Sequence, residues 1–267
     1  MTTLTKCEKD ILILVKTYPA PSKKYVETSC TAGITSDGQP IRIYPIPFRL
    51  LKGEAQYKKW QWVNTQIFKN PADHRLESFK ADYTSLRPGP SISNKQWDLR
   101  IKWLQKFPTF KTIDELNKAR EDRGITLGII KPDSIDDLEF RPESAEWTPE
   151  QAAKLARDMD EDLFATNLTT HIEHKLQKVP FGFYYHYTCG GVKQVAKITD
   201  WEISALFFNT HKSTDWQEKM RKKYVSEFGK QDVYLIFGNQ HRFADQWLII
   251  GVIAAPKGTQ SSLEFDF

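Results

Sequence analysis

DILILVKTYPAPSKKYVETSCTAGITSDGQPIRIY, residues 10–44, is the stretch that decides the fold of the N-terminal part. The run Asp10–Lys16 is short, apolar and rich in branched side chains, which is typical of a buried β-strand. Residues 25–34 and 40–44 are two further predicted strands. Asp37-Gly38 favours a hairpin turn between them, because such turns need residues that tolerate positive φ.

The strand signal continues beyond this stretch. Residues 60–68 and 75–83 are two more predicted strands, and a short helix is expected within residues 48–57. Five short strands separated by turns predict a small β-barrel. Pro88-Gly89-Pro90 ends this unit.

A second run of elements follows. Two predicted helices, residues 97–107 and 112–123, lead through Gly124 into a strand at residues 125–130. Residues 133–162 are acidic and poorly periodic until Thr148-Pro149-Glu150-Gln151, which predicts a capped helix start. The remaining elements rebuild a five-strand pattern, with strands at 181–189, 194–198, 233–237 and 247–254 and helices at 201–208 and 215–228.

The predicted fold class is α+β and strand-rich, with two OB-like five-stranded barrels joined by a helical, acidic spacer. The length of 267 residues is comfortable for two domains. The expected organisation is a basic first barrel (1–90), the spacer (91–124), a second barrel with inserted helices (125–256) and a flexible tail (257–267).

Composition points to a cytoplasmic protein without a membrane segment. Three cysteines, Cys7, Cys30 and Cys189, are too few and too odd in number for a disulfide framework. The first ten residues are polar and charged, unlike a signal peptide. The longest apolar run, Trp247–Pro256, is too short to cross a bilayer.

The charge is divided unevenly along the chain. Residues 1–132 hold 23 basic and 13 acidic residues, a formal charge of +10, whereas residues 133–267 hold 15 and 21, a charge of −6. Such asymmetry indicates a polyanionic partner, although two ordinary solvated surfaces would look the same.

Basic and aromatic residues crowd into the predicted first barrel. OB barrels bind single strands through a charged groove, with rings stacked under the bases. Arg42 and Tyr44 share one strand face by the period of two, as do Trp60 and Trp62, although the Trp pair could instead pack inward. The candidate nucleic-acid-binding residues are Tyr18, Lys23, Lys24, Tyr25, Arg42, Tyr44, Arg49, Lys58, Lys59 and Trp60.

No catalytic, cofactor or metal site is recognisable in the sequence. His171/His174 and His186/Cys189 each offer two ligand types, fewer than a zinc site needs. Asp73, Glu77 and Lys80 would not face one way on a strand, so they do not form a nuclease site. Phosphate loops and nucleophile elbows are absent, and no cofactor is expected.

The C-terminal tail matches a short docking pattern. Gln260, Leu263 and Phe265 fit the Gln-x-x-Leu-x-Phe form of peptides that bind bacterial sliding clamps. Leu263 and Phe265 would fill apolar pockets and Gln260 would supply a hydrogen bond. The tail is therefore a candidate partner-binding segment, with a disordered end as the alternative.

Several strings, in order, resemble the bacterial family of dual-OB-domain proteins. They are Tyr18–Tyr25, Ala32-Gly33-Ile34, Ile41–Arg49, Tyr57–Trp62, Phe140–Ser144, Asp200–Ile203 and Trp247–Gly251. The resemblance implies two OB barrels and nucleic-acid binding, within bacterial genome defence or maintenance. A Cys-rich knuckle that relatives often carry before the Asp200 string is reduced here to Cys189, so no metal site is expected.

The sequence therefore predicts a non-catalytic protein or sensor that binds nucleic acid, with a single strand as the expected form. Two alternatives stay open. One is a metal-dependent nuclease or nucleotide-processing enzyme whose carboxylates or histidines converge only in the fold. The other is an adaptor that recruits proteins through its C-terminal tail.

Overall fold

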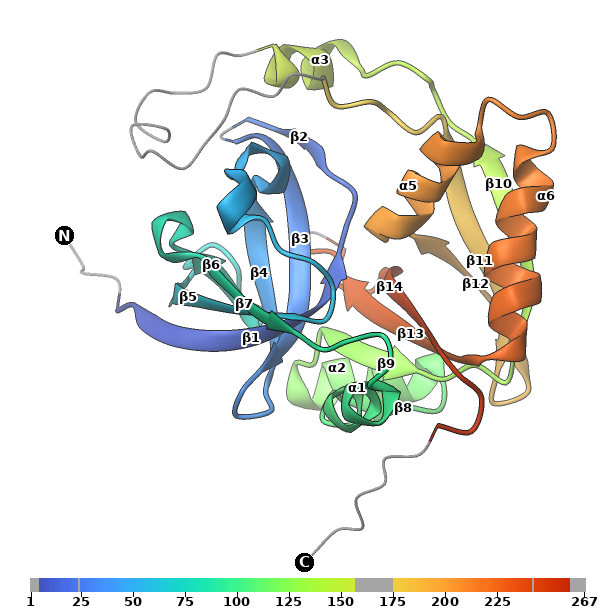
Figure 1. Ribbon diagram of the computed structural model, residues 1–267, viewed down its shortest axis with the longest axis horizontal. Helices are drawn as coiled ribbons and strands as arrows, with labels where there is room; N and C mark the ends of the chain where they lie inside the picture. The colour runs from blue at the N-terminus through green and yellow to red at the C-terminus, as the bar shows by residue number, and fades with distance from the viewer. Residues whose placement is uncertain (1–4, 24, 157–174, 242, 260–267) are drawn as a thin grey trace, which may run out of the picture.

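The N-terminal unit of the computed structural model is a closed barrel (Figure 1). The structure describes residues 5–23, 25–156, 175–241 and 243–259. Strands pair in the order β1-β3-β4-β6-β5, and β5 pairs back with β1. This order is compatible with an OB fold, and the predicted first five-stranded barrel is confirmed. Its strands are β1 (Cys7–Lys16), β3 (Val26–Thr35), β4 (Pro40–Ile46), β5 (Gln61–Lys69) and β6 (Ser78–Ala81), with β2 (Ala20–Ser22) and β7 (Arg87–Ser91) added at its margins.

The predicted hairpin turn joins β3 and β4. Gly38 has a φ of 83°, and its N–H donates to the Thr35 carbonyl at 2.8 Å. A residue with a Cβ would be strained there. Residues 48–57, predicted to hold a short helix, contain two single 3₁₀ turns, at Phe48–Leu50 and Gly53–Ala55.

The second unit is built on a seven-stranded sheet of order β10-β11-β12-β14-β13-β9-β8. No pairing between described residues joins the two ends of this sheet, so a second closed barrel is not confirmed. Only residues 131–133 separate β9 from β10. The strands are β8 (Thr109–Phe110), β9 (Leu127–Ile130), β10 (Ser134–Pro142), β11 (Phe181–Cys189), β12 (Val192–Ile198), β13 (Asp232–Asn239) and β14 (Trp247–Ala255).

Helices accompany both units, and the ends of two of them carry clear capping residues. Thr112 caps α2 (Ile113–Arg123), which ends at Gly124 with a φ of 67°. Thr148 and Gln151 form the predicted capping box of α3 (Pro149–Leu155). The other helices are α1 (Trp97–Leu104), α5 (Trp201–Thr210) and α6 (Trp216–Arg221), the last continuing as a π-helical segment, Lys222–Glu227.

Strand β10 lies where the sequence predicts no strand. Leu138 faces the core of the second unit, while Glu139 is partly exposed. The register with β11 shifts between Ile135 and Asp137, which marks a bulge. The bulge breaks the alternation of apolar and polar residues, and this hides the strand from a period-two pattern.

Residues from both units form one apolar core between them, which is separate from the core inside each unit. Ile11 and Ile13 of β1 point into the first barrel, while Leu12 and Leu14 pack in a second cluster with residues of β9, β13 and β14. The run Ile11–Val15 is apolar throughout because both faces of β1 are buried there. Figure 1 shows the barrel, in blue to cyan, lying against the red strands β13 and β14.

The predicted spacer, residues 91–124, is basic, so the prediction that it is acidic is wrong. Residues 91–124 contain eight Lys or Arg and five Asp or Glu. Helix α1 packs Ile101 and Leu104 into the shared core, and β8 joins the second sheet. The exact domain limits stay a prediction. Among the described residues, no helix has the length and apolar character needed to cross a membrane.

Candidate nucleic-acid interface

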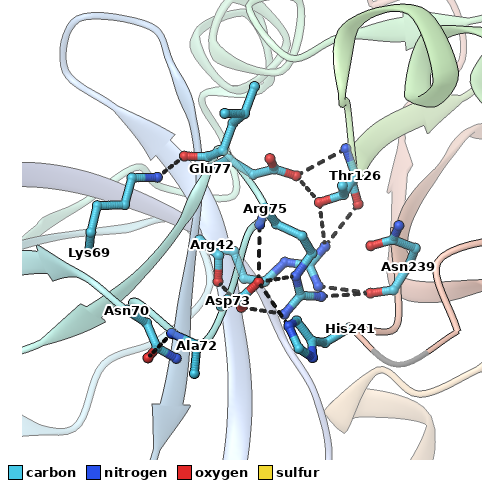
Figure 2. A network of polar contacts seen from close by, with 12 residues as sticks. Arg42, Lys69, Asn70, Ala72, Asp73, Arg75, Glu77, Thr126, Asn239 and His241 are labelled. Carbon is cyan, nitrogen blue, oxygen red and sulfur yellow. Dashed lines mark hydrogen bonds and ion pairs between the residues drawn. The ribbon is translucent and has the colours of Figure 1, made fainter.

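Arg42 lies at the centre of the contact between the two units, not on a surface. Its side chain is on β4, and the residue is 3% exposed. Nη1 donates to the Asn239 carbonyl at 2.9 Å and Nη2 to the Thr126 carbonyl at 2.8 Å (Figure 2). The prediction that Arg42 contacts phosphates is therefore corrected: the second unit covers this face of the barrel.

A wider polar network surrounds Arg42. Arg75 also donates to the Asn239 carbonyl, at 2.9 Å, and holds Asp73 through Nε and Nη2 at 2.9 and 2.7 Å. Burial acts to raise the pKa of Asp73, but hydrogen bonds from Arg75 and Ser78 bring it well below the usual range. Figure 2 shows these side chains gathered between the barrel and the loop that carries His241. The network therefore joins the units.

Three other predicted binding residues are also used inside the fold. Lys59 forms ion pairs with Asp200 at 3.1 Å and Glu202 at 2.8 Å, and only 12% of its side chain is exposed. Trp60 is 6% exposed and Tyr25 is 9% exposed. These burials correct the expectation that the three side chains line a groove.

The rest of the predicted set is divided between internal contacts and exposed positions. Tyr18 turns towards the second unit, where its hydroxyl donates to the Gln177 carbonyl at 2.9 Å. Arg49 pairs with Glu27 at 3.1 Å. Lys24 lies outside the described residues, and Lys23, Tyr44 and Lys58 are exposed.

A different basic and aromatic surface lies on α1. The rings of Trp62, on β5, and Trp103, on α1, meet edge to face with centroids 4.9 Å apart. Both residues are partly buried, with one side packed against the shared core. Lys106 Nζ lies 5.3 Å from the Trp103 centroid, and Lys102 is exposed on the outer side of the same helix. We call Trp62, Lys102, Trp103 and Lys106 the α1 surface.

The cations around α1 lack acidic partners. Residues 87–111 contain six Lys or Arg and one acidic residue, Asp98. In the part of the chain that the structure describes, none of these six cations forms an ion pair with a carboxylate. In the second unit, by contrast, nine cations among the described residues are paired: Lys118, Arg120, Lys131, Arg141, Lys154, Lys197, Lys219, Arg221 and Lys223. Unpaired cations beside indole rings suit a polyanion that carries flat bases.

Arg100 differs from the exposed lysines because it is partly buried and packs against the rings of Trp60 and Trp97. Its Cζ lies 4.9 Å from the Trp60 centroid and 5.0 Å from that of Trp97. Its Nη2 donates to the Ile92 carbonyl at 2.7 Å. Trp60 has a φ of 61°, which is strained for a bulky residue.

Two family models match the sequence, and the boundary between the two matched regions lies near residue 107. Residues 7–106 match a domain of unknown function (DUF8758) and residues 108–266 match a domain of unknown function (DUF8757). The chain belongs to the DUF8757 family. The division falls between the end of α1 and β8, so α1 belongs with the barrel. A search of curated proteins found no match.

The remaining sequence candidates have mixed outcomes. Gln260, Leu263 and Phe265 lie outside the described residues, as do His171 and His174, so the tail stays a prediction. Over the described ranges, no group of three or more His, Cys, Asp or Glu is placed to hold a metal ion.

Sequence reasoning missed the α1 surface although a signal existed. The excess of basic residues over residues 87–111 is visible in the sequence, and Lys102 and Lys106 are spaced to share one helix side. The contact between Trp62 and Trp103 was not visible, because it depends on how α1 docks on β5.

Proposed function

We propose that this protein binds single-stranded nucleic acid, with the α1 surface as its contact. The observation that supports this most is the edge-to-face pair of Trp62 and Trp103, with Lys106 Nζ 5.3 Å from the Trp103 centroid. Lys106 and the neighbouring Lys102 are exposed, and neither forms an ion pair with a described residue. Lysines can contact backbone phosphates while a base stacks on an indole ring. A duplex hides its bases, so the rings favour a single strand. The proposal includes a cytoplasmic location, as the cysteine usage suggests.

We also propose that the second unit is an OB-like barrel. Its strands follow the order β10-β11-β12-β14-β13-β9, with β12 and β14 parallel. The first barrel has the same kind of order, with its parallel pair at β4 and β6. If β9 and β10 are the two halves of one bent strand, the second unit has the OB topology, with α5 and α6 inserted before the fourth strand.

Fluorescence anisotropy with a dye-labelled oligothymidylate tests the function. Trp103→Leu should weaken binding by about 1–3 kcal/mol, the usual contribution of one stacked base. The double variant Lys102→Gln/Lys106→Gln should lower the slope of log affinity against log salt by about 1.4, or ~0.7 for each lysine.

Lys23→Gln/Lys58→Gln is the matched control, since both lysines are exposed and neither belongs to the α1 surface as defined above. No binding by the wild type at low salt refutes the function. Binding that the control pair weakens, and the α1 pair does not, moves the contact to the residues predicted from sequence.

A further inference from the structure

A histidine, a glutamate and an arginine converge on the outer face of β10 and β11. His186 Nε2 lies 2.7 Å from Glu139 Oε2. Arg141 holds the same carboxylate through two hydrogen bonds, from Nε and Nη2, each 2.8 Å long. The three side chains are between 36% and 47% exposed, so solvent and a ligand can reach them.

The strand register explains why these side chains meet. Glu139 lies opposite Tyr184, and His186 is two residues further along β11 on the same face. The Arg141 guanidinium lies 3.8 Å from the Tyr184 ring centroid. Two neighbouring strands therefore present a phenol, an imidazole, a carboxylate and a guanidinium together.

The electrostatics assign different tasks to these groups. Hydrogen bonds from Arg141 and then from His186 lower the pKa of Glu139 to about 2. The carboxylate therefore stays ionised at neutral pH, where it can orient the imidazole and stabilise its protonated form. A carboxylate of this kind is a weak base, so the imidazole is the group of this pair that can transfer a proton.

Cations lie on the same face, as a phosphate would require. Lys197 on β12 is opposite Tyr184. Val195, opposite His186, is 47% exposed, which indicates that this face of β12 is open to solvent. Lys197 is held by Glu143 at 2.6 Å, and Lys193 is exposed further along β12. Arg141 contacts the Glu139–His186 pair directly, through its hydrogen bonds to Glu139.

We propose that Glu139, Arg141, Tyr184 and His186 form a general acid–base site that cleaves RNA by internal transesterification. His186 takes the proton from a ribose 2′-hydroxyl, and the 2′-oxygen forms a bond to the adjacent phosphorus. The bond from phosphorus to the 5′-oxygen breaks, and the proton is returned to that oxygen by His186 or through solvent water. The products are a 2′,3′-cyclic phosphate and a free 5′-hydroxyl.

The remaining groups have supporting roles in this step. Arg141 stabilises the negative charge that develops on the phosphoryl oxygens, and Glu139 positions His186. Tyr184 offers a ring on which the base next to the cleaved bond can stack. RNA is the substrate class because its 2′-hydroxyl supplies the nucleophile. This inference does not depend on binding at the α1 surface.

Cleavage of end-labelled RNA by the full-length chain, with EDTA present, tests the site. The wild type should release fragments that end in a 2′,3′-cyclic phosphate and leave 2′-O-methyl RNA and DNA intact. His186→Gln should slow cleavage by about 10²–10⁴-fold, the usual contribution of a positioned acid–base group. Added imidazole should partly restore cleavage by His186→Gly, which a structural role would not explain.

Matched variants complete the test. Glu139→Gln should slow cleavage, and Glu139→Asp should recover part of the loss. His74→Gln, which changes an exposed histidine of the first unit, should cleave as the wild type does. Intact RNA with the wild type, or equal cleavage by His186→Gln purified in parallel, overturns the proposal. Neither result affects the proposed binding of oligothymidylate, because this DNA has no 2′-hydroxyl and cannot be cleaved in this way.

Discussion

Arg42→Met should destabilise the protein without weakening nucleic-acid binding by the folded form. The substitution keeps an unbranched apolar stem but removes the two hydrogen bonds to the Asn239 and Thr126 carbonyls. Hydrogen bonds that involve a charged group contribute about 1.5–3 kcal/mol each.

The surroundings reduce this loss. The Asn239 carbonyl keeps Arg75 Nη1 at 2.9 Å, and the Thr126 carbonyl keeps the Asn239 N–H at 3.2 Å, so neither acceptor is left without a donor. Arg42 Nε has no partner in the wild type, and its removal relieves part of the burial penalty. We expect a net loss of about 2–3 kcal/mol, which lowers the Tm by about 4–12 °C for a chain of this size.

Urea unfolding followed by Trp fluorescence measures this loss, and oligothymidylate anisotropy below the unfolding transition measures affinity. Lys58→Met is the control, because Lys58 is exposed on the same barrel. Unchanged stability of Arg42→Met together with lost affinity would refute the reasoning, since Arg42 would then contact the ligand instead of the second unit.

Three further predictions concern stability. Gly33→Ala should unfold the barrel or destabilise it by more than about 2 kcal/mol, since the new Cβ would collide with the Leu12 carbonyl; circular dichroism and urea unfolding measure this, and a wild-type midpoint would contradict it. Asp200→Asn should lower the free energy of unfolding by about 3 kcal/mol in the same assay, because the buried carboxylate accepts from the Val252 N–H at 2.9 Å and pairs with Lys59. A loss below about 1 kcal/mol would argue against that ion pair. Burial lowers the pKa of Lys16 to about 8 in the folded protein, so the unfolded chain binds more protons than the folded one between pH 8 and 10.5. The wild type should therefore gain stability relative to Lys16→Met as the pH rises through that window. If paired unfolding curves show the same stability difference at both ends of the window, the pKa shift is contradicted.

The sequence predicts the strands of the first barrel because each carries its own local signal. Five apolar residues follow one another at Ile11–Val15, and Asp37-Gly38 marks the turn. The helix stop at Gly124 and the helix cap at Thr148 were equally visible as local chemistry. Strand β10 was missed because a bulge interrupts its alternation.

Binding residues were harder to predict because periodicity assigns a side chain to a face but not to a neighbour. Arg42 was predicted to face solvent, but the second unit covers it. Tyr44, on the same strand, is 40% exposed. The pairing of His186 with Glu139 joins residues from two strands, one of which carried no sequence signal, and no local pattern could have predicted it.

The apolar character of β1 on both sides limits how this chain can be divided. A fragment that ends near residue 107 would expose Leu12, Leu14, Ala32 and Ile34, which in the intact chain pack beside Ile236 and Ile250. Expressed alone, such a fragment should aggregate or pair with another copy through this surface. The two family regions are therefore separate in sequence but depend on each other for solubility, and biochemical dissection will need point substitutions in the whole chain.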